Sequence, residues 1–485
     1  MNNAVRLLGY RGRLPARAEN RGARRMMRYA LSLLCLLLLA HGASLVLSGC
    51  ASNLATGERH LNLISESQEV AMGQEADGQV IASLGLYPDS ALQRYVQALG
   101  AKLAGSSERP NLPWTFRVID DPAVNAFAIP GGFIYVTRGL MAYMMNEAEL
   151  SSVIGHEIGH VTAQHSVHRI SEQQLTQVGI AGALKAEHLG LRYMIRAGND
   201  PREMIDVFDM LGRVSSAGGG GRAPEWLATH PNPENRSGSI QKEIDTLAFD
   251  LGSLAVNKNG YLRLIDGVVF GQNPREGFFR DNHFYHPELE FELGFPSGWQ
   301  TVNQKNAVVA VSPNQDAVIQ ISMAKTRSAS EAARTFFQQE GVQSEREETS
   351  TVNGLNAVSA QFRAQSEQQV LRGRVSFVEL QGNTYQLLGY ASEQLWPKYQ
   401  DVITTAVRDF RRLTNPSILQ MQPMRLAIIN VSQRVSLEQL AQQERSPVLL
   451  ETLAIINQTE ANARFNAGDR VKIVRGEKLV FQAGY

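Results

Sequence analysis

The stretch His156-Glu157-Ile158-Gly159-His160 places two histidines four positions apart, with a glutamate directly after the first. Residues four apart on a helix lie one turn apart on the same face, so the two imidazoles can bind one Zn²⁺ ion. Glu157 projects about 100° around the helix from His156, where it can reach a metal-bound water without being a ligand. Two histidine ligands with a glutamate as general base are the pattern of a zinc peptidase.

The alternative is a chance match on a polar helix face. Val153, Ile154 and Ile158 flank the histidines, which predicts a mostly buried helix. A buried helix rarely carries two histidines and a glutamate without partners or a metal. The apolar context therefore favours the metal site.

Several elements must position this helix, which we expect over 147–168 with Asn146 as its cap. An extended segment over 125–136, turning at Pro130-Gly131-Gly132, precedes it. We predict that Asn125 and Ala126 begin an edge strand to which a peptide substrate adds as a further strand; the alternative is an ordinary core strand. The glycine-rich stretch 215–224 is interpreted as a mobile loop, either a lid or a passive linker.

The N-terminus looks like an export signal. Arginines crowd residues 6–28, and an apolar run follows over 29–47. The run ends in Leu47-Ser48-Gly49-Cys50, which resembles the bacterial lipoprotein box, and this resemblance implies that Cys50 is lipidated after cleavage. We therefore expect a signal peptide and lipobox over 1–50 and a tether over 51–62; the alternative is a permanent membrane span. The only other cysteine, Cys35, lies within the signal, so no disulfide is expected.

The remaining composition is that of an ordinary globular protein. The 485 residues contain 47 basic and 47 acidic side chains, and no basic stripe with aromatic platforms indicates a nucleic-acid partner. The patterns predict an α+β chain in which a mainly helical zincin-type domain carries a small edge sheet. The expected domains are a metallopeptidase domain (63–275), an antiparallel α+β domain (283–413) that weakly resembles PsbP, and a degenerate LysM-like module (421–485).

Several motifs in the same order resemble the gluzincin peptidase family that contains the CAAX prenyl endopeptidase and the periplasmic beta-barrel assembly-enhancing protease. The resemblance implies a Zn²⁺ cofactor held by His156 and His160, and Glu157 as general base. His230 matches a histidine beside the family's active site, where it bonds the oxyanion or caps the zinc; the alternative is a simple neighbour of the following helix. The matching motifs are Val124–Gly132, the helix with His156 and His160, Leu189–Met194 and Trp226–Pro231.

The third zinc ligand departs from the family pattern. Lys185 occupies the column of the ligand glutamate, and a cation repels Zn²⁺. The segment just before it is also shorter than in the family pattern. We predict Glu187 as the substitute ligand; His188 and Glu203 are other donors. His165 and His168, beyond the histidine pair, are interpreted as surface residues or as neighbours of the ligands.

Two functions follow from these residues. The first is a zinc endopeptidase of the bacterial envelope that cuts misfolded or stalled envelope proteins, anchored in the outer membrane through Cys50 and facing the periplasm. The second is a peptidase-like lipoprotein with impaired catalysis, which binds unfolded chains or an assembly partner without cleaving them. Zinc content separates the two hypotheses.

Overall fold

The computed structural model describes residues 50–53, 55–56, 59–61, 64–165, 179–217, 233–247, 250–365 and 369–477. These form two compact units, a small one at the N-terminal end and a large one that contains everything from residue 64 onward. In the small unit, β1 (Cys50–Ser52) pairs antiparallel with β2 (Arg59–Leu61), so a short hairpin lies within the predicted tether. No helix in these described ranges is both long and apolar enough to cross a bilayer.

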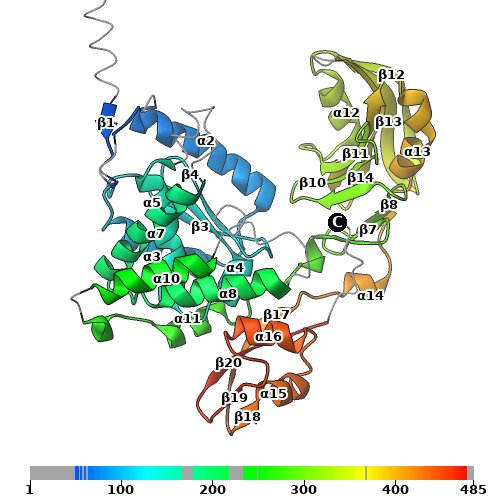
Figure 1. The fold of residues 1–485 in the computed structure, drawn as a ribbon. Coiled ribbons are helices and arrows are strands. Elements are labelled where there is room, and N and C mark those ends of the chain that lie inside the picture. Colours follow the sequence, from blue (N-terminus) through cyan, green and yellow to red (C-terminus); the bar gives the residue numbers. More distant parts are fainter. Residues whose placement is uncertain are drawn as a thin grey trace, which may run out of the picture. The chain divides into compact units, whose positions relative to one another are not determined.

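Helices dominate the first part of the large unit (Figure 1). The predicted cap of the central helix is confirmed, because Asn146 accepts a hydrogen bond from the amide of Glu149. The helices are α2 (Glu66–Leu84), α3 (Ser90–Ala104), α4 (Arg138–Tyr143), α5 (Glu147–Thr162), α7 (Gly179–Arg196), α8 (Glu203–Ala217), α10 (Pro233–Asp245) and α11 (Lys258–Ile265), with 3-10 turns η1 (Leu251–Ser253) and η2 (Pro274–Glu276).

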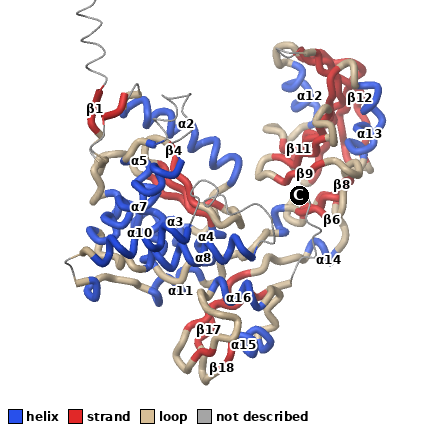
Figure 2. The backbone as a smooth tube through the Cα atoms, in the orientation of Figure 1, coloured by secondary structure: helices blue, strands red, loops and turns tan. Residues whose placement is uncertain are grey.

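A three-stranded sheet lies beside these helices (Figure 2). Its order is β3 (Thr115–Ile119), β5 (Phe133–Thr137) and β4 (Ala126–Ile129), with β3 parallel and β4 antiparallel to β5. The tight turn between β4 and β5 needs positive φ at Gly131 and Gly132, which glycine adopts without strain. Strand β4 is therefore an edge of this sheet, and it contacts α5.

Helix α5 packs against α7 through backbone rather than side chains. A Cβ atom added at Gly159 would lie 2.6 Å from the carbonyl oxygen of Ala186, and one at Gly190 would lie 2.8 Å from the amide nitrogen of His156. Nearly every residue of α5 is buried, because α3, α7 and α8 also contact it. The histidine helix is thus fixed in a rigid setting.

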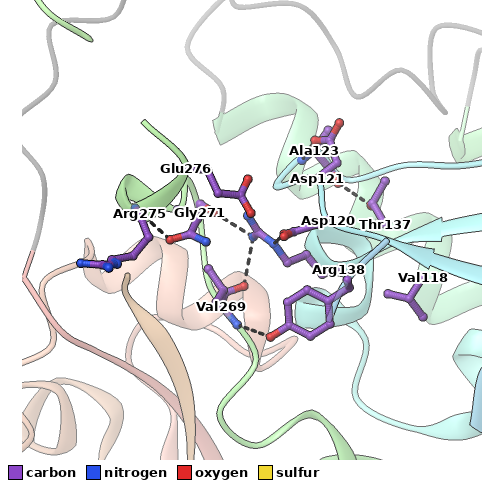
Figure 3. Close-up of polar contacts among 12 residues, drawn as sticks. Val118, Asp120, Asp121, Ala123, Thr137, Arg138, Val269, Gly271, Arg275 and Glu276 are labelled. Atoms are coloured by element: carbon purple, nitrogen blue, oxygen red, sulfur yellow. Dashed lines mark hydrogen bonds and ion pairs between the residues drawn. The ribbon is translucent and has the colours of Figure 1, made fainter. Parts of the chain in front are cut away.

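A buried arginine fixes the segment that leaves this helical part. Arg138 donates from Nε to Asp120 at 2.6 Å and from Nη1 to the carbonyl oxygens of Val269 and Gly271, at 3.1 and 2.8 Å (Figure 3). Its side chain is 1% exposed. Since a buried guanidinium is stable only when its donors are satisfied, these contacts fix the course of residues 269–271.

An antiparallel α+β part follows, as predicted. Its helices α12 (Ala329–Phe337) and α13 (Trp396–Arg408) pack into separate apolar clusters on opposite faces of a seven-stranded sheet. The sheet order is β12 (Val342–Val352), β13 (Leu355–Gln365), β14 (Val370–Leu380), β15 (Asn383–Ser392), β11 (Ala317–Met323), β10 (Ala307–Val311) and β9 (Gln300–Asn303). A second sheet has the order β16 (Arg411–Arg412), β8 (Phe291–Gly294), β7 (His283–His286) and β6 (Phe278–Arg280).

Strand β12 was not predicted, because its sequence is polar or charged at every position between its two terminal valines. It forms one edge of the seven-stranded sheet, and most of its residues are exposed. Glu345, Glu347 and Glu348 lie around an irregularity in its pairing with β13, where Arg346 has a positive φ. An edge strand whose side chains are mostly exposed carries no apolar alternation for a sequence pattern to detect.

The last described residues form a small C-terminal module, here residues 421–477, after the short helix α14 (Pro416–Leu419). The predicted order of strand, helix, helix and strand is confirmed, with one extra pair of short strands. Its elements are β17 (Arg425–Asn430), β18 (Val435–Ser436), α15 (Leu437–Gln443), α16 (Leu450–Ile456), β19 (Arg464–Phe465) and β20 (Arg470–Arg475). Its likeness to LysM stays a prediction.

Candidate metallopeptidase site

The two histidines of α5 converge on one point. Nε2 of His156 and Nε2 of His160 are 3.0 Å apart. Two nitrogens that each lie about 2.0–2.1 Å from a tetrahedral Zn²⁺ are separated by roughly 3.3 Å, so only a small adjustment is needed to place a metal between them. His156 is 2% exposed, and a buried imidazole without charge is the form that binds zinc.

A third histidine orients this pair. Nδ1 of His165 is 2.7 Å from Nδ1 of His160, so a proton on either nitrogen makes a hydrogen bond. His165 is buried directly after Gln164, whose positive φ turns the chain back at the end of α5. Of the two interpretations that the sequence left open, a neighbour of the ligands is the one that the structure supports. His168 lies outside the described residues.

Glu157 is buried in the middle of α5, at 2% exposure. Arg236, on α10, is 3% exposed, and its guanidinium interacts electrostatically with the carboxylate of Glu157. Burial lowers the pKa of Arg236 to about 10, while the charge of Glu157 raises it. The guanidinium also stacks on Phe208, 4.5 Å from the ring centroid.

The carboxylate predicted as third ligand is engaged by the same arginine. Glu187, on α7, is 1% exposed and forms an ion pair with Arg236. Among the described residues, no group of three or more histidine, cysteine or acidic side chains is arranged to hold a metal. The distance between the two histidine nitrogens fits Zn²⁺. Glu187 as a third ligand stays a prediction. Lys185 lies in the part of α7 whose side chains are not described.

The other donors lie elsewhere. His188 contacts Glu243 of α10 and is 45% exposed. Glu203, on α8, accepts a hydrogen bond from Asn146 at the start of α5. His230 lies outside the described residues, between α8 and α10. Asn125 precedes the edge strand β4 and Ala126 is its first residue, so the predicted substrate edge lies on an edge strand that contacts α5; peptide binding there stays a prediction.

Sequence reasoning missed Arg236, although a signal for it exists. Arg236, Ile240 and Ile244 are spaced four residues apart on α10, and all three are buried. An arginine at a position of the buried face needs an acidic partner, because an unpaired buried charge costs several kcal/mol. That spacing identifies Arg236 as a residue of the site's interior.

Comparison with known proteins agrees with this geometry. Residues 90–186 and 181–244 match the profile of peptidase family M48. Residues 90–244 of the chain are thus similar to peptidase family M48. The two M48 matches overlap over 181–186, around Lys185, where the sequence indicated a missing segment.

The curated proteins that this chain resembles are named as proteases. The beta-barrel assembly-enhancing proteases of Yersinia pestis and of Escherichia coli K12 are each 30% identical over 211 residues, which is 36% of this chain and 43% of theirs. The mitochondrial metalloendopeptidase OMA1 of Arabidopsis thaliana is 32% identical over 160 residues, 28% of this chain and 32% of its own. The chain thus spans less than half the length of these relatives.

Among solved structures, cyanobacterial PsbP from Synechocystis sp. PCC 6803 aligns with 27% of this chain and 91% of its own, at 16% identity and a TM-score of 0.24. The PsbP-like assignment of residues 283–413 stays a prediction.

Proposed function

We propose that the chain is a zinc-dependent endopeptidase of the bacterial envelope. The observation that carries the proposal is the convergence of His156 and His160 next to the buried Glu157. Zinc, when bound, lowers the pKa of water and polarises a carbonyl. His156 and His160 would hold the zinc ion, and we propose the carboxylate of Glu187 as the third ligand.

Glu157 would act as the base of the reaction. It accepts a proton from the attacking water and delivers it to the amine that leaves. The buried position of Glu157 excludes bulk water, which strengthens its interactions with charge that develops nearby. A peptide backbone would align along β4, because an extended chain can bond to the outer edge of that strand.

The names of the relatives suggest the setting and the substrate class. We infer that the substrates are misfolded or stalled envelope polypeptides, cut on the periplasmic side of the outer membrane. The lipoprotein box supports an anchor at Cys50, through acyl chains that insert into the bilayer.

One observation favours a second candidate function. Since Glu187 is engaged in an ion pair with Arg236, the site has one carboxylate fewer for a metal. A chain with only two histidine ligands would bind zinc weakly, and it would act as a peptidase-like protein that holds unfolded chains without cleaving them.

The zinc content of the purified mature chain, measured with casein cleavage, distinguishes these functions. We expect about one zinc per chain, and the Glu157→Gln variant should keep the metal but lose at least about 100-fold in cleavage rate, because it cannot accept a proton. The matched control is Glu393→Gln, in a surface ion pair with Arg363, which should cleave at the wild-type rate. A metal-free chain that leaves casein intact would contradict the peptidase and support the binding function.

A further inference from the structure

A lysine of the C-terminal module is buried against the helices that carry the site. Lys472, on β20, is 0% exposed. Its Nζ donates to the carbonyl oxygen of Ala142 at 2.9 Å and to that of Met144, both at the end of α4. Residues 471 and 473 on either side are buried apolar side chains. A buried ammonium is costly unless it is bonded, so this contact is specific.

A second residue of the same module, Gln458, bonds to the first turn of α5. Glu149, which is 1% exposed, accepts hydrogen bonds from the Met145 amide at 2.8 Å and from Nδ2 of Asn146 at 3.0 Å. It also accepts one from Nε2 of Gln458 at 2.8 Å. Burial raises the pKa of Glu149 and lowers that of Lys472, and each charge opposes the shift of the other.

The module is joined to the helical part by more than these polar contacts. Its apolar residues belong to the same core cluster as those of α4 and α5. Strand β17 also bonds to the residues just before the segment that Arg138 fixes: the amide of Gly267 donates to the carbonyl oxygen of Leu426, and the amide of Leu426 donates to that of Val268. Apolar packing and backbone hydrogen bonds therefore both join the module to the peptidase part.

The contacts act on the same helix face as the zinc-binding histidines. Glu149 precedes His156 by seven residues, almost two helical turns, so both side chains project from one side of α5. The backbones of α5 and α7 are in close contact, so there is no space between the two helices. A displacement of the first turn of α5 therefore reaches His156.

We propose that Lys472 and Gln458 are positioning residues for the metal site: the C-terminal module holds the first turn of α5 and thereby sets the positions of His156 and His160. This inference rests on the proposed function only for its link to zinc. It gives the predicted LysM-like module a role inside the peptidase, in place of a separate binding site.

Hydrogen exchange of the full chain, followed by mass spectrometry, tests the docking. In Lys472→Met, amides of 145–156 should exchange at least about 10-fold faster than in the wild type, and in Gln458→Ala about 3-fold faster, because the first turn of α5 opens more often. Amides of β14 and β15 should not change in either variant. Lys398→Met, at an exposed lysine on α13, is the matched control and should leave α5 at the wild-type rate.

Chelator competition tests the link to zinc. We expect both variants to bind zinc at least about 10-fold more weakly than the wild type, the loss typical when the support of a metal ligand is removed. The double variant Glu149→Gln/Lys472→Met removes both buried charges. It should recover thermal stability relative to Lys472→Met but keep the weakened zinc binding, because the bonds to Ala142 and Met144 are still absent.

Wild-type exchange of 145–156 in both Lys472→Met and Gln458→Ala would overturn the proposal, as would wild-type zinc affinity in the double variant. If Lys472→Met does not fold, Gln458→Ala and the double variant decide. A wild-type chain that binds no zinc would remove the proposed function, whereas the exchange measurement would still test the docking in the metal-free protein.

Discussion

His160 lies between two other imidazoles, and both of its ring nitrogens have a defined neighbour. Nε2 faces His156 and Nδ1 faces His165. A ligand whose second nitrogen is hydrogen-bonded keeps one tautomer and one ring orientation, which strengthens metal binding. The site thus depends on at least one side chain outside the zinc-peptidase pattern.

Another histidine should make the stability of the chain depend on pH. His286, on β7, is largely buried, and burial lowers its pKa from 6.5 to about 4. A base with a depressed pKa in the folded state stabilises the fold above pH 6.5, and this contribution is lost as the pH falls through 4. Urea unfolding should show that the wild type loses about 2 kcal/mol more than His286→Asn between pH 7 and pH 4.

The asparagine is a suitable replacement, because its side-chain oxygen can accept the Leu289 amide bond that Nδ1 of His286 accepts at 3.2 Å. Equal pH dependence in the wild type and in His286→Asn would show that His286 titrates normally.

At the scale of residues, the sequence was informative where spacing alone decides the contact. The four-residue spacing of His156 and His160 predicted their convergence, and the cap at Asn146 was predicted from residue type. The Glu187–Arg236 ion pair joins α7 to α10, and only the tertiary packing decides that Arg236 reaches this carboxylate. The same holds for Lys472 and Glu149.

At the scale of elements, the α5–α7 pair depends on small residues. Gly155, Gly159 and Gly190 allow the two backbones to touch, which side chains would prevent. The helices therefore cross more closely than a pair with ordinary apolar contacts, and the histidines gain a rigid support.

Gly159→Ala should lower the free energy of unfolding by about 1–3 kcal/mol, because the new Cβ would lie 2.6 Å from the Ala186 oxygen. Gly78→Ala, within α2, is the matched control: no atom lies within 4 Å of its new Cβ, so it should stabilise the chain by up to about 1 kcal/mol. Denaturant unfolding measures both variants. A Gly159→Ala chain as stable as Gly78→Ala would show that α5 and α7 can separate without cost.

The extended segment expected over 125–136 contains β4 and all of β5 except Thr137, and the helix expected over 147–168 is α5, which ends earlier, at Thr162. Elements without apolar periodicity were missed, of which β12 is the longest. The antiparallel class of the second part was also predicted, because its strands alternate between buried and exposed residues, as in β11. The order of strands in the sheet depends on pairings far apart in sequence, which alternation does not encode.

At the scale of the whole molecule, the peptidase part and the C-terminal module share one hydrophobic core. A chain that ends at residue 420 would expose the apolar surfaces of α4 and α11 that the module covers. We expect it to lose cooperative thermal unfolding and to bind a hydrophobic dye such as ANS, as partly folded proteins do.

A chain that starts at Ile64 is the control, because it lacks the small N-terminal unit and keeps the large one except for residues 54–56. It should unfold cooperatively, within a few degrees of the full chain. Cooperative unfolding of the chain that ends at 420, followed by circular dichroism, would contradict a shared core.

The acidic edge strand β12 has a consequence for self-association. Two copies that approached through this edge would bring the exposed carboxylate of Glu347 close to that of the other copy, and like charges repel. The negative charge on β12 therefore disfavours the addition of strands from other molecules to the seven-stranded sheet. Without this charge, strands of neighbouring molecules could join at the same edge.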